Sequence, residues 1–387
     1  MIARWLICVA LFASPAVYGA DNGGSCAAPA AAAAADTKTT VVDVPDYRQN
    51  ENDDPRATAF DQDSQAYQKQ LIETLETSAD PRDWALAADA FHIGTGDETG
   101  KRDALLKRAL AAAPDDVLVS WMVVDGSRGQ SNDLALSALE TLKTTDSDNA
   151  AVWLDVLSVA AKHHDHDGVS AALKRMSATS QFNSHFAEMS EAVVAAYRRF
   201  PMPDALYDEM PDEAKLTPKE AMPLIYATSV TSAFALPAFQ SLTNACRTDA
   251  SGRNADRAAD CQTIGRMMVA NSDTLIGTAI GSAVLRLSRT FDDNDVAAAR
   301  DVSWIRHQLT KLATESPAAV TAFLPNQVEY HQDWLTSNSE NYAMRKLVER
   351  AGISGYPPDD WVDPDSRFTA TIMASDENYF ADHNVDY

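Results

Sequence analysis

The feature that most constrains the fold of this chain is a short acidic turn that recurs every 33 residues. The turns begin at Asp80, Ala113 and Asp146, and a segment rich in Ala, Leu, Val and Trp follows each of them. Each interval also holds a second segment of helical character, at residues 102–112, 134–143 and 169–176. A period of about 33 residues with two helices in each unit is typical of a helical solenoid, in which each unit packs against its neighbours.

Two motifs inside this repeat resemble the tetratricopeptide-repeat superfamily. The motif Ala109-Leu110-x-x-x-Pro114 is similar to the end of the second helix of that repeat. Residues 149–157, with the pattern Asn-Ala-x-x-Trp-x-x-Val-Leu, are similar to the start of its first helix. The resemblance implies an α-α superhelix over residues 80–180, whose curved surface holds another polypeptide.

Outside the repeat the sequence also predicts helices, because it lacks both sustained period-two alternation and Asn-Gly or Asp-Gly hairpin turns between β-branched runs. Asp80 precedes a proline in the first helical position, and residues 217–220 and 337–340 form capping boxes. Gly352 stands where a left-handed residue would end the last of these helices. We therefore expect an all-α protein, with less regular helices beyond Phe200.

Residues 1–20 predict an export signal. Arg4 provides a positive start and residues 5–13 form an apolar core. Cleavage is expected after Gly19 or Ala20, where small residues follow that core. The core is well short of the ~20 residues that span a bilayer. The mature protein is therefore expected in the periplasm or outer envelope of a bacterium, or secreted from the cell.

Residues 21–61 form an Ala-rich and polar linker without an amphipathic face, which we expect to be weakly ordered. The linker contains Cys26, which follows a small residue, as lipidated cysteines do. Gly23, however, stands where an aliphatic residue belongs in such a site. Two interpretations of Cys26 stay open: a lipid anchor and a free thiol.

Cys246 and Cys261 lie on either side of a short polar segment between two helical patterns. In an exported protein, such a pair predicts a disulfide. A redox dithiol would need Cys-x-x-Cys spacing, and a zinc site would need a second close pair of ligands. We therefore expect a structural disulfide between these two residues.

The charge of the chain excludes two classes of partner. It has 32 Lys and Arg against 56 Asp and Glu, which gives a net charge of −24. Binding to nucleic acid depends on Lys and Arg that displace counterions from phosphates, and binding to an anionic membrane needs polybasic patches. We expect neither partner.

The most chemically suggestive segment is the run of residues 162–168, Lys-His-His-Asp-His-Asp-Gly. His163, His164, Asp165 and His166 are its candidate metal ligands, although consecutive residues before a glycine more simply form a solvated turn between helices. The chain has no Gly-x-Ser-x-Gly elbow and no His-Glu-x-x-His motif. We predict no catalytic residues and no cofactor from the sequence.

The predicted organisation has five parts. They are the signal (1–20), the linker (21–61), the tetratricopeptide-like repeats (62–200), further helices with the disulfide (201–355) and an acidic-aromatic tail (356–387). The tail either covers the last helix of the solenoid or offers an acidic-aromatic peptide to a partner.

Together these features predict an exported interaction scaffold that binds another polypeptide, with an enzyme as the less expected class. An envelope hydrolase or a small-ligand-binding protein, each using a cleft between helices, is the alternative. Perturbed carboxylates or histidines gathered in a pocket would favour the hydrolase.

Overall fold

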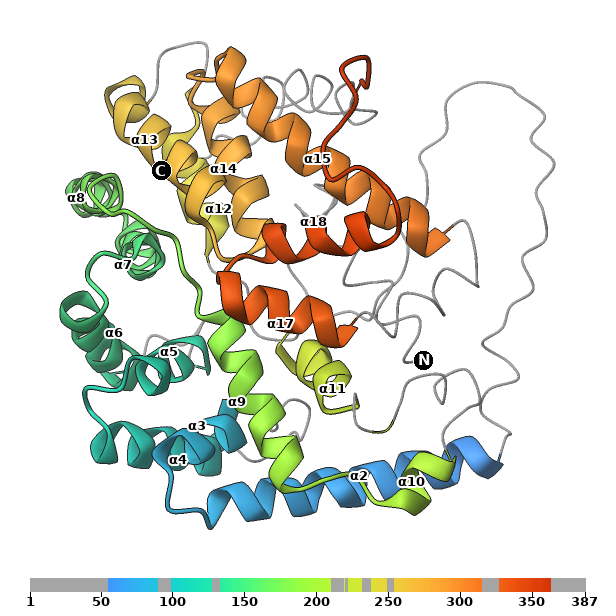
Figure 1. Ribbon diagram of the computed structural model, residues 1–387. Helices are drawn as coiled ribbons and strands as arrows, with labels where there is room; N and C mark the ends of the chain where they lie inside the picture. The colour runs from blue at the N-terminus through green and yellow to red at the C-terminus, as the bar shows by residue number, and fades with distance from the viewer. Residues whose placement is uncertain are drawn as a thin grey trace, which may run out of the picture.

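The structure is a computed structural model that describes residues 55–89, 99–126, 133–209, 219, 222–231, 238–248, 254–314 and 327–362. Every regular element within these ranges is a helix, which confirms the all-α prediction (Figure 1). No helix of the described part is long and apolar enough to cross a membrane. The predicted signal and Cys26 lie outside the described residues, and the end of the predicted linker lies in a helix that begins at Pro55.

The predicted repeat region consists of three consecutive pairs of contacting helices along one side of the molecule (Figure 1). The pairs are α3 (Pro81–Asp89) with α4 (Thr99–Ala112), α5 (Val117–Gly126) with α6 (Asp133–Thr145), and α7 (Ala150–Lys162) with α8 (His166–Met176). Adjacent pairs also contact one another, through α3 with α5 and through α6 with α7. Assignment of these pairs to the tetratricopeptide superfamily stays a prediction.

The acidic turns cap the first helix of each pair. Asp80 accepts a hydrogen bond from the backbone N–H of Arg82, at 2.9 Å. Asp116 caps α5 by accepting from the backbone N–H groups of Leu118 and Val119. Asn149 caps α7 by accepting from the N–H of Ala151 at 3.0 Å. The first two turns are also linked, because Arg82 in the first turn of α3 forms an ion pair with Asp116 at 2.8 Å.

A central helix, α9 (Phe186–Arg199), joins the helix pairs to the rest of the molecule (Figure 1). It contacts α2 (Pro55–Glu76), α3, α11 (Met222–Thr231) and α17 (Gln327–Ser337), and α10 (Asp204–Glu209) packs on α2. Arg199 at the end of α9 donates to Asp83 at 2.8 Å, and only 2% of Asp83 is exposed.

The second half of the chain is less regular. Its further elements are α12 (Phe239–Cys246), the 3-10 helix η4 (Ala255–Arg257), α13 (Ala258–Asn271), α14 (Leu275–Leu287), α15 (Asp293–Thr314) and α18 (Glu340–Arg350). Two glycines bring α13 and α14 together: a Cβ on Gly281 would lie 2.8 Å from the carbonyl oxygen of Gly265. This close approach of two backbones requires glycine at that position.

The described residues bury two hydrophobic clusters. The larger one continues from α2 through the three helix pairs into α12, α13 and α14, with Trp121 and Phe182 among its fully buried side chains. The smaller one joins α15, α17 and α18 around Ile305 and Trp334. Helix α12 packs on α7, so the larger cluster connects the two halves of the chain at the third helix pair.

The first residues of the predicted C-terminal tail pack on α15 and α18. The ring of Trp361 meets that of Trp304 edge to face, with the centroids 5.3 Å apart, and Arg300 donates to the carbonyl oxygen of Trp361 at 2.9 Å. The guanidinium of Arg345 lies 4.0 Å from the ring centre of Tyr356. Residues 363–387 lie outside the described part of the chain.

Candidate functional site

One wall of the candidate site is the histidine-rich turn between α7 and α8. His163 is the C-cap of α7, and His164 has a left-handed backbone with a φ of 53°. Asp165 caps α8 by accepting from the backbone N–H of Gly168 at 2.9 Å. A Cβ on Gly168 would lie 2.3 Å from the Asp165 carboxylate, so a larger residue at this position would displace the capping side chain.

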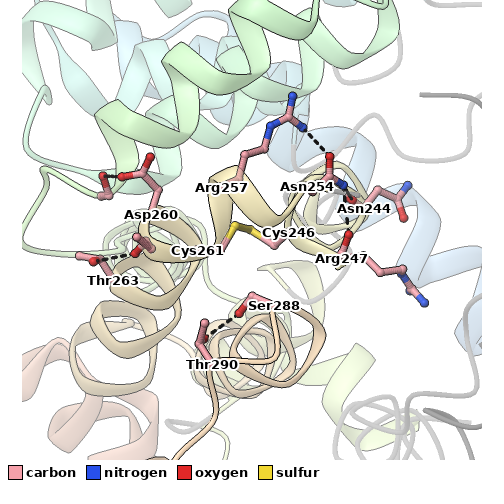
Figure 2. The surroundings of a disulfide bond; sticks show 12 residues. Asn244, Cys246, Arg247, Asn254, Arg257, Asp260, Cys261, Thr263, Ser288 and Thr290 are labelled. Carbon is pink, nitrogen blue, oxygen red and sulfur yellow. Dashed lines mark hydrogen bonds between the residues drawn. A yellow bond between two sulfur atoms is a disulfide. The ribbon is translucent and has the colours of Figure 1, made fainter. Parts of the chain in front are cut away.

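The opposite wall is formed by α12 with Arg247, which follows it, and by Asn254 and Arg257 before α13. The structure joins Cys246 to Cys261 by a disulfide, with the two Cα atoms 5.6 Å apart, and this confirms the predicted pair (Figure 2). Asn254 lies between the two cysteines with a φ of 59°. Its side chain donates to the carbonyl oxygen of Arg247 at 3.1 Å and therefore fastens the two ends of the segment to each other (Figure 2).

Between these walls lies a pocket of about 280 Å³, which we call the junction pocket. Its polar lining comes from His164, Asp165 and His166 on the first wall, Gln240, Ser241 and Asn244 on α12, and Lys162, Arg247, Asn254 and Arg257 around them. Lys162, the turn residues and Gln240 are exposed, so the pocket opens to the surface. Several amides and cations converge there, which is typical of a polar binding site.

Three of the four predicted metal candidates line this pocket, namely His164, Asp165 and His166, whereas His163 does not. Within the described ranges, no group of three or more His, Cys, Asp or Glu is arranged to hold a metal ion. Asp165 is instead engaged in capping α8.

Among the described residues, the histidine whose pKa is shifted most lies elsewhere, at the start of α9. His185 has a left-handed φ of 56°, and its ring lies between Asp146, at 3.0 Å from Nε2, and Glu188, which contacts Nδ1. We call these three residues the His185 cluster. Burial alone would lower the pKa of His185, but hydrogen bonds and charge attraction from both carboxylates raise that pKa to about 9.

A second perturbed group joins α14 to α18. Asp273 is 1% exposed and accepts from the Ser184 hydroxyl at 2.8 Å, while its Oδ1 is buried without a hydrogen-bond partner among the described residues. Burial raises the pKa of Asp273 above its ordinary value. Glu340 accepts from the backbone N–H of Leu275 at 2.7 Å, and burial, together with the charge of Asp273, raises the pKa of Glu340 to about 7.

The perturbed groups and the junction pocket are therefore separate features. The His185 cluster and the Asp273–Glu340 pair are hydrogen-bonded into the contacts between elements, and none of these residues lines the junction pocket. Their chemistry fits a structural role, because it stabilises the contacts of α9, α14 and α18. The pocket, in contrast, presents polar groups to the surface.

The sequence did not single out His185, Asp273 or Glu340. His185 belongs to a set of scattered histidines without a usable spacing, and the two acids are among 56. Only the fold brings them to their partners, which are 39 residues away for the pair His185–Asp146 and 65 for the pair Leu275–Glu340.

Comparison with known proteins does not assign this chain to a family. No protein-family model, no curated protein and no solved structure matches the chain. We therefore infer the function from the chemistry of the site itself.

Proposed function

We propose that this protein is an exported helical-repeat scaffold of the bacterial envelope that binds another polypeptide. The observation that supports it most is the succession of three contacting helix pairs whose last turn opens on the junction pocket. Stacked helix pairs build extended surfaces that suit polypeptide partners. The pocket adds a defined polar recognition point to such a surface.

The distribution of perturbed groups favours binding over catalysis. A hydrolytic site would bring activated carboxylates or histidines to a cleft that the substrate can enter. Here the side chain of His185 is 10% exposed and Asp273 is 1% exposed, and both lie outside the junction pocket. The envelope hydrolase is therefore the weaker alternative.

A small-ligand-binding protein is the second candidate, because the junction pocket, at about 280 Å³, is close to the size of small-molecule sites. Its open rim weighs against this candidate. Small-molecule sites bury most of the ligand surface, whereas the rim of this pocket is made of exposed side chains.

Site-specific photocrosslinking in the native envelope tests the proposal. A photoreactive amino acid replaces Gln240, an exposed residue of the pocket rim, or Gln68, an exposed glutamine of α2 that serves as the matched control. We expect a defined polypeptide adduct at Gln240 that is absent at Gln68, and the purified polypeptide should bind the protein. Adducts at neither position, or equal adducts at both, would contradict the proposed binding surface.

A further inference from the structure

We infer that the junction pocket binds a carboxylate group presented by an acidic segment of the partner polypeptide. The inference rests on the proposed function and adds to it the chemistry of the contact. Three observations support it: the positive charge of the pocket, hydrogen-bond donors of Lys162 and Arg257 that have no carboxylate partner among the described residues, and the fixed backbone of the rim.

The charge of the pocket is opposite to that of the chain. Among the described residues, Lys162, Arg247 and Arg257 line it, against a single carboxylate, that of Asp165, so this described lining carries 3 − 1 = +2. The whole chain carries −24. The Asp165 carboxylate is also engaged with the backbone N–H of Gly168. A locally positive pocket on an acidic protein attracts anionic groups and repels cationic ones.

Two of the cations have no carboxylate partner among the described residues. Nε of Arg257 is buried without a hydrogen-bond partner. Its other nitrogens make only long contacts, 3.3 Å to Asn254 Oδ1 and 3.5 Å to the carbonyl oxygen of His166. Lys162 stands at the end of α7 and forms no ion pair within the described ranges. A carboxylate could accept from both side chains, as guanidinium and ammonium groups commonly donate to it.

The rim that holds these donors is fixed in three ways. His164 and Asn254 both have left-handed backbones, with φ values of 53° and 59°. Asn and His adopt this conformation more readily than most non-glycine residues, and it fixes the direction of the chain at both positions. The disulfide fastens the second wall to α13 (Figure 2). A fixed rim reduces the entropy that binding would otherwise cost.

The open rim identifies the source of the carboxylate. Lys162, His164 and His166 are exposed, so a group attached to a larger molecule can enter while its chain continues over the surface. A free dicarboxylate would offer the same charged group but would leave much of itself in solvent. We therefore assign the carboxylate to an Asp or Glu side chain of the bound polypeptide.

Fluorescence anisotropy with a labelled glutamate-rich peptide tests this inference, with a matched glutamine-rich peptide and free glutarate as further arms. The full-length mature protein is compared with Lys162→Gln, Arg257→Gln and Arg257→Lys. Lys174→Gln, an exposed lysine of α8 outside the pocket, is the control. Circular dichroism and the midpoint of urea unfolding report whether each variant folds.

We expect the glutamate peptide to bind and the glutamine peptide not to bind. Lys162→Gln and Arg257→Gln should each weaken binding about tenfold, the usual effect of losing one charge-assisted hydrogen bond, while Arg257→Lys retains more affinity and Lys174→Gln has no effect. Added salt should weaken binding in the native protein.

Unchanged binding in folded Lys162→Gln and Arg257→Gln would overturn the inference, and so would glutarate that binds as tightly as the peptide. The two proposals fail separately. If the Gln240 crosslink forms in Arg257→Gln with the same yield as in the native protein, the scaffold stands and the carboxylate contact is wrong. If the native protein forms no such crosslink, the scaffold itself is wrong.

Discussion

At the scale of single residues, the buried side chain of His185 makes the stability of the fold depend on pH. The folded-state pKa of His185, about 9, lies above its ordinary value of 6.5, so its charged form is favoured by folding. The stability that it contributes is fully present below pH 6.5 and is lost as the pH rises through about 9. Asp146 and Glu188, whose pKa values are lowered, contribute stability that is lost as the pH falls below 3.8 and 4.5.

Replacement of His185 by Asn should remove the charge and keep a residue that tolerates a left-handed backbone. We expect the free energy of unfolding below pH 6.5 to fall by about 2–4 kcal/mol, because Asp146 is left partly buried without its cation. His164→Asn, at an exposed left-handed histidine, is the matched control and should be nearly neutral. Urea unfolding of both variants makes the comparison, and equal losses would contradict the role of the His185 cluster.

The pKa of Glu340, like that of His185, is raised by folding, so its contribution to stability is also lost as the pH rises. Its folded-state pKa is about 7 against an ordinary 4.5, so the stability linked to its neutral form is present below pH 4.5 and is lost as the pH rises through about 7. Glu340→Gln keeps an acceptor for the Leu275 N–H and cannot ionise. Above pH 7 we expect it to be more stable than the native protein by about 1–3 kcal/mol, and to differ little below pH 4.5. Urea midpoints that differ equally at both ends of this range would contradict the assignment.

At the scale of elements, the crossing of α13 and α14 depends on a backbone contact. A Cβ at Gly281 would meet the Gly265 carbonyl oxygen and the Met268 Cβ, both at 2.8 Å. Gly281→Val should therefore lower the free energy of unfolding by about 1–3 kcal/mol or more, as overpacking does. Gly100→Ala on α4, where nothing lies within 4 Å, should be neutral or slightly stabilising. Chemical denaturation that shows no difference between the two variants would contradict the observed crossing.

The disulfide between α12 and α13 should stabilise both the fold and the junction pocket. It joins residues 15 apart in sequence, and a loop of this size contributes about 3 kcal/mol by the chain-entropy estimate. We expect the double replacement Cys246→Ser and Cys261→Ser to lose about that much unfolding free energy and to weaken peptide binding. Thiol titration of the unreduced native protein is the control, and two reactive thiols from this pair would contradict the bond.

Elements were predictable from the sequence where a single residue marks a boundary. Asp80 and Pro81 correctly predict the start of α3. Gly352, with its φ of 77°, follows α18 as expected. The start of α18 was placed at Ser337, but the cap is Ser339, which accepts from the N–H of Tyr342. Ser339 is followed three residues later by Tyr342 and not by Glu or Gln, so the capping-box pattern selects Ser337, but Ser337 is the last residue of α17.

The junction pocket was not predictable in the same way. The turn at residues 162–166, which forms one wall, was predicted only as a candidate metal site or a solvated turn. The disulfide beside the other wall was predicted from the spacing of its cysteines. The two walls are more than 70 residues apart, between His166 and Gln240, and meet because α12 packs on α7. Local sequence carries no information about that contact, so the cations of the pocket could not be connected beforehand.

At the scale of the whole molecule, much of the acidic charge serves the fold itself. Many carboxylates cap helices or pair with arginines, as Asp80 and Asp83 do. The junction pocket is positive within this acidic surface, which favours acidic partners at one place and disfavours them elsewhere.

The predicted export signal also determines where the mature chain should begin. If residues 1–20 are an export signal, the protein recovered from the envelope should begin near Asp21. Intact-mass spectrometry measures this directly. A mass that retains residues 1–20 would contradict export, and a chain that begins at Cys26 with added acyl mass would establish the lipid anchor in place of a free N-terminus near Asp21.

The central claim is that a partner polypeptide binds where the third helix pair meets the disulfide-closed segment. Hydrogen exchange with mass spectrometry tests it most directly, comparing the protein alone with its complex with the polypeptide recovered by crosslinking. We expect added protection in residues 162–169, 240–248 and 254–257, with little change in α15 and α18. Protection confined to other helices, with these two segments unchanged, would contradict it.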